Sequence, residues 1–417
     1  MFEKVIEKLA SLIEIIGLVF LNKLDNVRAS NSELIEEIAT RKPSFSLDMP
    51  SSAIIDKIFD YLSPEKFNFF RLFSVIGIVF VLGVIFSFIP ILYPYYHVLA
   101  VLLFLAGIAL IGIGGKLTEH ISINSVKSKL SYELMAGLFI LGLIGIIANF
   151  VRVGIPLFEA ELRAYYHNQL WSFSFILYMI GMMGVYIKNK DAFTFNLLFV
   201  LGLLIALLSG FRTDFILFLG PLVLFKYLKG EFDKTKTFYI VFFFLFFVIA
   251  IRYSLLVFSS LQPSFQEILS SDILFGKVGL NFYVLSIFIY EGGLTGVGGG
   301  MLSLGKFFFQ QFSIPSLEFG AVGADLVINY ARHFESSLVG PTYLDMGIPG
   351  VLVFMSLLGF FTELPKRIYR KLKDDLFLGL YGIQVSIMLV WIQTGLVQYY
   401  LFFLFFIIGI YCLVKTR

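Results

Sequence analysis

The chain has 417 residues, of which 58% are hydrophobic and 15% are charged, and phenylalanine alone occurs 50 times. A soluble globular domain has about 45–50% apolar and about 25% charged residues, and a chain of this size has too little interior to bury so much apolar surface. The composition therefore excludes a water-soluble protein and predicts an all-α polytopic membrane protein. The net charge of +3 adds little, because in a membrane protein the side on which charges lie matters more than their sum. The single cysteine, Cys412, excludes an intramolecular disulfide and a cysteine metal cluster.

The start of the chain differs from the rest. Apolar residues recur there at helical spacing, but the longest uncharged run, Ile15 to Leu21, is far shorter than the ~20 residues that a membrane span requires. This pattern predicts an amphipathic helix that lies on the membrane surface or against another part of the protein. A polar segment of mixed charge follows, with one short helix expected to start near Pro50. We therefore expect a cytoplasmic amphipathic and polar region over residues 1–66 and a polytopic membrane domain over residues 67–417.

The membrane domain contains apolar segments of about 16–24 residues, the length that a bilayer core of ~30 Å requires. They cover residues 72–92, 95–114, 132–151, 170–187, 192–209, 214–229, 237–258, 338–361, 376–396 and 398–414. The pattern predicts about ten transmembrane helices.

The loops between these segments indicate the orientation. If the N-terminus is cytoplasmic, the inner segments are "GKLTEHISINSVKSKLS", "KNKD", "KYLKGEFDKTK", "ELPKRIYRKLKDD" and the tail "KTR". Each of them carries at least two Lys or Arg residues, as the positive-inside rule requires. We expect a multi-pass protein of the cytoplasmic (plasma) membrane with both termini in the cytoplasm.

One large extramembrane loop, at about residues 259–337, is predicted on the outer side. It alternates apolar stretches with glycine, which is typical of short or re-entrant helices that line a cavity. The loop includes the spacing G-x-x-x-x-G-K from Gly300 to Lys306. Phe307 follows where a nucleotide-binding P-loop has Ser or Thr, so no nucleotide site is predicted.

Arginine is enriched on the predicted outer side. Beyond Arg71, five of the seven outer basic residues are Arg, whereas the inner loops contain mostly Lys. A guanidinium presents a planar bidentate fork and stays charged when desolvated, so the bias favours a phosphate-binding site; the alternative is chance in a small set. The candidate phosphate ligands are Arg152, Arg163, Arg212, Arg252 and Arg332.

The stretch "LLSGFRTDFILFLGPL" places Arg212 two residues before Asp214, between two long apolar runs. The two charges could simply end a membrane helix. Alternatively, Arg212 is a ligand that Asp214 orients, or Asp214 pairs with another arginine. The gathering of other arginines on the same side favours a functional role.

The segment "NYARHFESSLVG" places Arg332, His333 and Glu335 together just before a predicted span. A polar collar at the end of a helix would explain them. Together, however, they supply a phosphate ligand, a general base and a group that orients the base. Glu291 is a further acid of the outer loop that could act as the base.

The four histidines are scattered and show no metal-ligand spacing, so no metal site is expected. His97 and His167 lie near the outer ends of predicted spans, where an interfacial role is expected. Asp345 lies inside a predicted span and is followed by Gly347, Pro349 and Gly350. An acid at that depth needs a partner or a water-filled cavity, so we expect it to be structural or to line a cavity.

Three segments together resemble a known family. They are "GIPLF" with a following arginine, "SGFRTDFILFL" after a span, and "SSLVGPTYLDMGIPGVLVFMSLLGF" after the long outer loop. They are similar to the oligosaccharide repeat-unit polymerases, which belong with the O-antigen polymerases and, more distantly, the O-antigen ligases. The resemblance extends from about residue 70 to the C-terminus.

The resemblance implies a membrane glycosyltransferase with a GT-C-like fold that acts at the outer face. Its donor would be a polyprenyl-pyrophosphate-linked oligosaccharide, and it would use no nucleotide sugar, cofactor or obligatory metal. Arg212 matches the arginine after the fifth span and Arg163 the one after "GIPLF", and outer-face arginines hold the pyrophosphate in such enzymes. Arg332 and His333 match only by their place in the outer loop. The candidate bases for the acceptor hydroxyl are His333, Glu335 and Glu291.

The implied partners are the lipid-linked oligosaccharide donor and acceptor and the membrane lipids. A flippase and a chain-length regulator are candidate protein partners, and no nucleic acid is expected. Two alternative functions use similar sites. A ligase would differ only in its acceptor, whereas a flippase or exporter should carry charges along a path across the membrane, and the predicted spans contain few.

The predicted orientation can be tested with introduced cysteines. A cysteine in "KGEFDKTK" should be shielded from a membrane-impermeant thiol reagent in intact cells, whereas one near Gln262 should react, because only the latter segment is predicted outside. The unmodified chain is the control, since its Cys412 lies in the last predicted span. The reverse labelling pattern would invert every site assignment.

Overall fold

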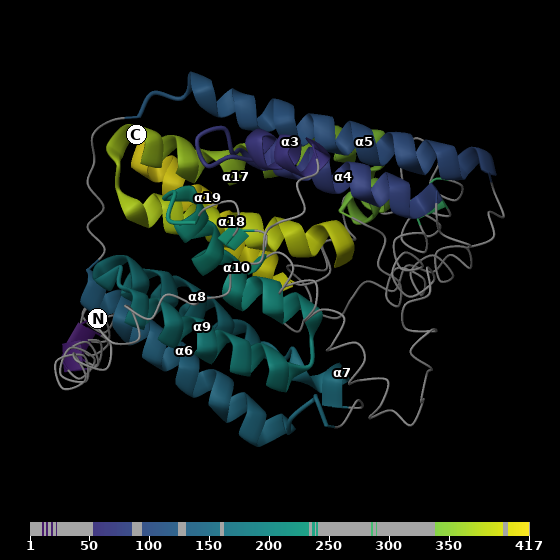
Figure 1. The fold of residues 1–417 in the computed structure, drawn as a ribbon. Coiled ribbons are helices and arrows are strands. Elements are labelled where there is room, and N and C mark those ends of the chain that lie inside the picture. The colour runs from purple at the N-terminus through teal and green to yellow at the C-terminus, as the bar shows by residue number, and fades with distance from the viewer. Residues whose placement is uncertain are drawn as a thin grey trace, which may run out of the picture. The chain divides into compact units, whose positions relative to one another are not determined.

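Figure 1 shows the fold in a computed structural model. The structure describes residues 11, 14, 15, 18, 19, 22, 53–85, 94–123, 131–158, 162–232, 236, 237, 239, 240, 285, 286, 289, 338–394 and 399–416. Within these residues, all the regular secondary structure is helical.

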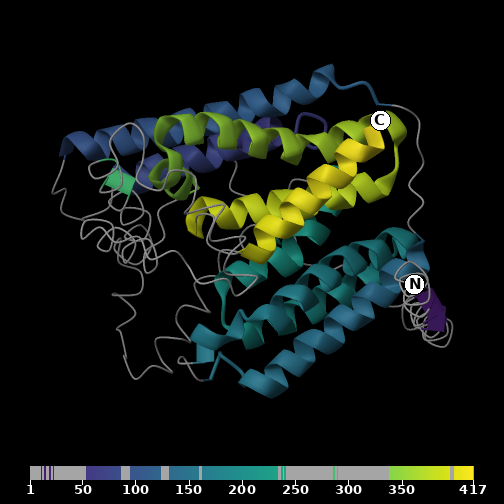
Figure 2. The same cartoon turned by 180° about the vertical axis from the view of Figure 1, so that it is seen from behind.

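The helices follow one another along the chain as Figures 1 and 2 show. They are α3 (Ala53–Tyr61), α4 (Phe69–Ile85), α5 (Pro94–Leu117), the 3-10 helix η1 (Thr118–His120), α6 (Tyr132–Val153), α7 (Arg163–Tyr166), α8 (Gln169–Asn189), α9 (Ala192–Ser209), α10 (Arg212–Leu228), α17 (Val339–Leu372), α18 (Asp375–Thr394) and α19 (Tyr399–Thr416). The short helix expected after Pro50 is α3.

Among the described residues, six helices are long and apolar enough to cross a membrane. They are Val98–His120, Tyr132–Val153, Gln169–Asn189, Ala192–Ser209, Met346–Leu372 and Asp375–Ile392, and the shorter apolar helices are Phe69–Val79 and Tyr400–Lys415. The chain is therefore a multi-pass membrane protein. Helices overlap nine of the ten segments predicted as spans; residues 86–92 of the first and most of the tenth, 237–258, lie outside the described residues. The number of spans stays a prediction.

The chain divides into two compact units, each built from segments that are far apart in the sequence. Unit 1 comprises residues 1–60, 124–262 and 368–386 and contains α6 to α10; unit 2 comprises residues 61–123, 263–367 and 387–417 and contains α4, α5, most of α17 and α19. Long-range contacts therefore hold each unit together. The domain boundary predicted after residue 66 stays a prediction.

Within unit 1, Glu14 of the N-terminal segment contacts the residue that caps α6. Ser131 precedes α6 in an extended conformation, and its Oγ accepts a hydrogen bond from Leu134 N at 3.1 Å. The same Oγ donates to Glu14 Oε1 at 3.0 Å. Glu14 thus lies against another part of the protein, which was one of the two positions expected for the N-terminal helix.

Helices α6 and α8 lie side by side in both views (Figures 1 and 2), and glycines allow their close approach. A side chain at Gly142 would overlap the backbone of Tyr178, and one at Gly181 would overlap the backbone of Phe139. The rings of Phe139 and Tyr178 pack with their centroids 5.2 Å apart. Because lipid supplies no hydrophobic force between helices, this close packing is what holds α6 against α8.

The C-terminal ends of α8 and α10 carry lysines that pair with the first residue of α18. Lys190 Nζ lies 2.6 Å from Asp375 Oδ2, and Lys229 forms an ion pair with Asp375 Oδ1. Burial by itself would lower the pKa of Lys229, but its hydrogen bond to Asp375 and the charge of that carboxylate outweigh burial and raise the pKa. These lysines belong to segments predicted as inner loops.

Helix α17 is longer than the predicted span and contains one break. Gly347 has φ 63° and ψ −150°, which interrupts the helical conformation. Residues other than glycine rarely adopt these backbone angles. The helix then continues to Leu372, through residues expected to form an inner loop. Within this extension, Arg367 Nη2 donates to Glu119 O at 3.0 Å, which ties the end of α17 to η1.

Gly181→Ala should lower the free energy of unfolding by about 1–3 kcal/mol, because the added methyl group would meet backbone atoms that cannot move aside. The higher helix propensity of Ala, worth up to ~1 kcal/mol, offsets part of this loss. The matched control is Gly202→Ala in α9, where a Cβ would lie 3.1 Å from the end of the Leu219 side chain, which can shift. Thermal unfolding of the purified protein in detergent measures the stability of both variants. An equal loss of stability in Gly181→Ala and Gly202→Ala would contradict the packing described for α6 and α8.

Candidate functional site

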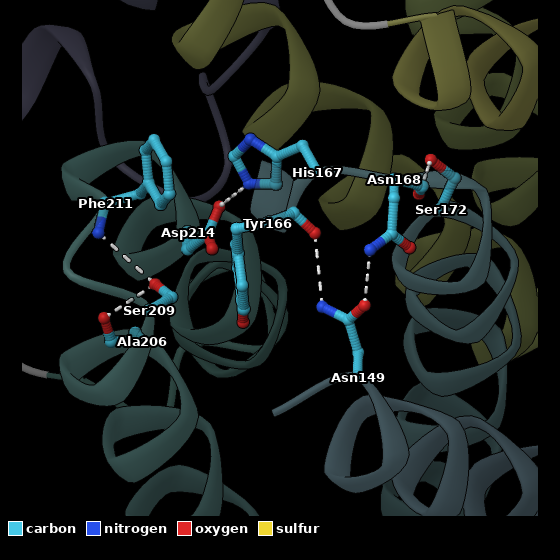
Figure 3. Close-up of polar contacts among 9 residues, drawn as sticks. All are labelled: Asn149, Tyr166, His167, Asn168, Ser172, Ala206, Ser209, Phe211 and Asp214. Atoms are coloured by element: carbon cyan, nitrogen blue, oxygen red, sulfur yellow. Dashed lines mark hydrogen bonds and ion pairs between the residues drawn. The ribbon is translucent and has the colours of Figure 1, made fainter. Parts of the chain in front are cut away.

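Several helix ends of unit 1 meet around the short segment between α7 and α8 (Figure 3). They are the C-terminal end of α6, the N-terminal end of α8 and the turn between α9 and α10. Backbone contact supports this arrangement: Leu157 N, in the turn after α6, donates to Leu208 O, near the end of α9, at 3.3 Å. The polar side chains that Figure 3 shows come from all of these elements.

Asn149 of α6 is completely buried and fixes the segment that precedes α8. Its Nδ2 donates to Tyr166 O at 3.1 Å, and its Oδ1 accepts from Asn168 Nδ2 at 2.7 Å (Figure 3). Asn168 is also the N-cap of α8, since its Oδ1 accepts from Trp171 N at 3.0 Å. Buried amides need their donors and acceptors paired, so Asn149 holds residues 166–168 in one position.

The turn between α9 and α10 is set by three residues. Gly210 has φ 66°, the left-handed conformation that ends many helices and that glycine adopts without strain. Ser209 Oγ donates to Ala206 O at 2.9 Å and accepts from Phe211 N at 3.2 Å (Figure 3). Phe211 is extended and precedes α10 directly, so Asp214 falls in the first turn of that helix.

Asp214 and His167 form an ion pair at the centre of this region (Figure 3). Asp214 Oδ1 lies 3.4 Å from His167 Nε2; the Asp214 side chain is 0% exposed and that of His167 is 19% exposed. Within the described part of the chain, Asp214 is the one buried carboxylate. The separation exceeds the about 2.7–2.9 Å of a tight charge-assisted hydrogen bond, as is common in sites without substrate.

Aromatic rings surround the imidazole of His167. Its centroid lies 4.3 Å from that of Phe211, 5.3 Å from that of Tyr166 and 5.7 Å from that of Trp171. The rings of Tyr166 and Trp171 are completely buried and lie 4.4 Å apart. This packing restricts the rotation of His167 and holds its Nε2 toward Asp214.

Three of the predicted arginines belong to the same end of unit 1. Arg212 is the first residue of α10, two residues before Asp214, and Arg163 is the first residue of α7, four residues before His167. Arg152 lies in the last turn of α6 and is exposed. For Arg163 and Arg212 the structure describes the position of the backbone. Their place next to the His167–Asp214 pair makes this end the candidate anion-binding site.

The other predicted site residues lie outside the described residues. They are Arg252, Arg332, His333, Glu335 and Glu291. Their roles stay predictions. Among the residues that the structure does describe, no three His, Cys, Asp or Glu side chains gather as a metal-binding group.

The sequence did not predict a role for His167 beyond the membrane interface. The prediction that Asp214 orients Arg212 or pairs with another arginine stays a prediction; the structure adds a contact between Asp214 and His167. One signal was available: "YYHNQLW" places His167 directly before Asn168, a residue type favoured at helix N-caps. The pairing itself depends on how the start of α8 packs against α10.

These features define a multi-pass helical membrane protein with a charged site at one end of a helix group. Over residues 67–405 the chain matches the model of a protein family described as "Putative O-antigen polymerase". The chain therefore belongs to the O-antigen polymerase family, and the resemblance seen in its motifs is confirmed. Comparisons with curated proteins and with solved structures find no match.

Asn149→Leu should lower the free energy of unfolding by about 1–3 kcal/mol, because Tyr166 O and the Asn168 amide would lose a buried partner. The matched control is Asn196→Leu on the exposed side of α9, which should change stability little. Thermal unfolding of the purified protein measures both variants. Equal stability of Asn149→Leu and the wild type would show that Asn149 does not hold the segment before α8.

Proposed function

We propose that the protein is a membrane glycosyltransferase that polymerises polyprenyl-pyrophosphate-linked oligosaccharide repeat units at the outer face of the cytoplasmic membrane. Membership of the O-antigen polymerase family over residues 67–405 carries this proposal. The arginine positions at one end of unit 1 support it, because a lipid pyrophosphate is an anion that guanidinium groups bind in a bidentate manner.

The charges at the two ends of unit 1 support the proposed sidedness. Arg152, Arg163 and Arg212 belong to one end of the helices, and Lys190 and Lys229 follow the other ends of α8 and α10. Lys-rich segments favour the cytoplasmic side. We therefore propose that the arginine end faces outward and that both termini are cytoplasmic.

The proposed reaction exchanges one bond for another. The acceptor hydroxyl attacks the anomeric carbon of the donor sugar, a new glycosidic C–O bond forms, and the bond from that carbon to the pyrophosphate oxygen breaks. The hydroxyl proton passes to a base, and polyprenyl pyrophosphate leaves. Negative charge grows on the leaving group, and cationic groups that are already in position stabilise it.

Residues of the outer loop are proposed to complete the site. Arg252 and Arg332 would add to the pyrophosphate contacts, and one base would take the acceptor proton. The candidate bases are His333, Glu335 and Glu291. Because the donor is already activated, the reaction requires no further cofactor. About ten spans and a GT-C-like fold are part of this proposal.

A ligase would use the same donor site and would transfer the glycan to a different acceptor. The lipid-linked glycans of a deletion strain separate the possibilities. Accumulated single repeat units indicate a polymerase, full-length polymer that is not transferred indicates a ligase, and units retained on the inner side indicate a flippase. The family match favours the first result.

Arg212→Lys should reduce polymer formation nearly as much as Arg212→Ala, because an ammonium keeps the charge but loses the bidentate fork. Loss of a contact used in the transition state should cost about 2.7–4 kcal/mol, or ~100–1000-fold in rate, by analogy with removed oxyanion donors. The measurement is glycan chain formation, normalised to folded protein in the membrane.

The matched control is Arg370→Lys, at an exposed position near the C-terminal end of α17. It should leave polymer formation unchanged, since this arginine lies in a segment predicted on the inner side. Near-normal polymer from Arg212→Lys would mean that Arg212 only marks the start of α10.

A further inference from the structure

We propose that Lys190, Lys229 and Lys373, here called the lysine cluster, bind the phosphate headgroup of an anionic phospholipid in the leaflet at their end of unit 1. The observation behind the proposal is that three helices end at these lysines and that their ammonium groups gather around Asp375 and the ring of Tyr369. The inference goes beyond the proposed function, because no step of glycosyl transfer depends on it.

Each lysine of the cluster stands at the C-terminal end of a helix. Lys190 is the C-cap of α8 and Lys229 is the C-cap of α10. Lys373 directly follows α17, and its N–H donates to Tyr369 O at 2.7 Å. A cation is favourable beside the last carbonyl groups of a helix, which carry partial negative charge. This effect explains one lysine for each helix, but it does not explain why the three lysines meet.

The three ammonium groups meet at the start of α18. Lys190 Nζ lies 2.6 Å from Asp375 Oδ2, and Lys229 pairs with the other oxygen of the same carboxylate. Lys229 Nζ also lies 5.3 Å from the centroid of the Tyr369 ring, and Lys373 Nζ lies 5.8 Å from the same centroid. Residues from three distant parts of the sequence thus form one group of cations.

The lysine cluster differs from the other lysine pairs at this end of unit 1. Lys188 pairs with Glu133 and Lys226 pairs with Glu231, each at 3.4 Å, so these two lysines have one acid each. In the cluster, two lysines share the carboxylate of Asp375. Three ammonium groups and this carboxylate leave two positive charges, which favours the binding of an anion.

The neighbouring carboxylate of Asp374 does not remove this excess. Asp374 Oδ1 accepts a hydrogen bond from Leu376 N at 3.0 Å, so it bonds the first turn of α18. Even when Asp374 is counted in full, three lysines and two aspartates among the described residues leave one positive charge. A phosphodiester carries one negative charge and compensates it.

The backbone conformation indicates that two of the lysines are present for their side chains. Lys190 has φ 51° and Lys373 has φ 57°, and they are the residues other than glycine with positive φ in the described part of the chain. Glycine is the usual residue at such a position after a helix, and other residues are strained there. Lys190 gains an ion pair in return, whereas Lys373 is exposed and contacts a ring. A bound anion gives Lys373 a stronger partner.

The surroundings favour a lipid headgroup as the anion. The side chains of Lys190 and Lys229 are 50% and 27% exposed, so a headgroup can reach both. One residue after Lys190 the chain enters α9, which exposes Leu197, Val200 and Leu204 at helical spacing, as expected for a face covered by acyl chains. Basic residues beside the ends of membrane helices bind anionic headgroups.

A purely structural role is the alternative, in which the lysines only tie helix ends to α18. The two roles differ at Lys373, because glycine adopts its backbone conformation without strain. Lys373→Gly should therefore leave thermal stability in lipid-free detergent unchanged or raise it. If the lysine binds lipid, the same variant should lose affinity for the lipid.

The test uses the full-length purified protein in detergent, with dioleoyl phosphatidylglycerol as the probe. Lys373→Gly should raise its Kd about fivefold, the factor that one basic residue contributes beside an anionic lipid. Dioleoyl phosphatidylcholine is the comparison, and it should bind the wild type more weakly, because its quaternary ammonium compensates the phosphate. Native mass spectrometry over a lipid titration measures each Kd.

A double variant and a matched control separate the site from total charge. Lys190→Gln with Lys373→Gly should weaken phosphatidylglycerol binding more than Lys373→Gly alone. Lys188→Gln with Lys415→Gln removes the same charge from residues outside the cluster and should leave the Kd near the wild-type value. Thermal unfolding shows whether each variant is folded, and Lys373→Gly alone decides if the double variant is not.

Wild-type affinity for phosphatidylglycerol in folded Lys373→Gly would overturn the inference and leave the lysines with a structural role. An equal loss of affinity in the control double variant would also overturn it, because total charge would then explain binding. Equal wild-type affinity for the two lipids would show that the site does not select an anionic headgroup. Displacement of the lipid by inorganic phosphate at the same concentration would replace the lipid with a soluble anion.

Discussion

The hydrocarbon core of a membrane contains no water, so every backbone N–H and C=O there has to be bonded within the protein. The apolar segments that the structure describes meet this requirement as helices. The constraint moves the polar chemistry to helix ends, where the first N–H and last C=O groups lack partners within the helix. Ser131, Asn168 and Asp191 cap the starts of α6, α8 and α9 with their side chains. The candidate site is formed from the same kind of helix ends, where polar groups are already required.

The two ends of unit 1 carry different cations, and the difference matches the role proposed for each end. Lys190 and Lys229 share the carboxylate of Asp375, which ties the ends of α8 and α10 to the start of α18. A flexible ammonium is well suited to such pairing near water. The other end has arginine at the first residues of α7 and α10. A guanidinium keeps its charge and its planar fork when water is removed, which is the condition under which a membrane enzyme would bind a lipid pyrophosphate.

The position of His167 follows from helix packing through a short series of contacts. Glycines at positions 142 and 181 let α6 and α8 approach closely. The approach allows Asn149 of α6 to bond both Tyr166 O and Asn168, so the residues before α8 are held in place. His167 lies within this segment and meets Asp214 in the first turn of α10, while Phe211 packs against its ring. The contact between His167 and Asp214 therefore depends on the packing of α6 against α8 and on the hydrogen bonds of Asn149.

The sequence by itself determined the membrane class, most of the helix positions and the family. The length of the apolar segments, the distribution of Lys and Arg, and the short motifs are local properties of the chain that do not depend on its tertiary structure. The segment 192–209, for example, coincides with α9 residue for residue. Local patterns also predicted that Arg163 and Arg212 belong to a site, which stays a prediction. Only the tertiary structure decided which side chain Asp214 faces. The nearest charge in the sequence is Arg212, and the structure also brings His167 from another element to within 3.4 Å of Asp214. That choice depends on the packing of the start of α8 against α10 and on side-chain burial, which the spacing of residues along one chain does not encode.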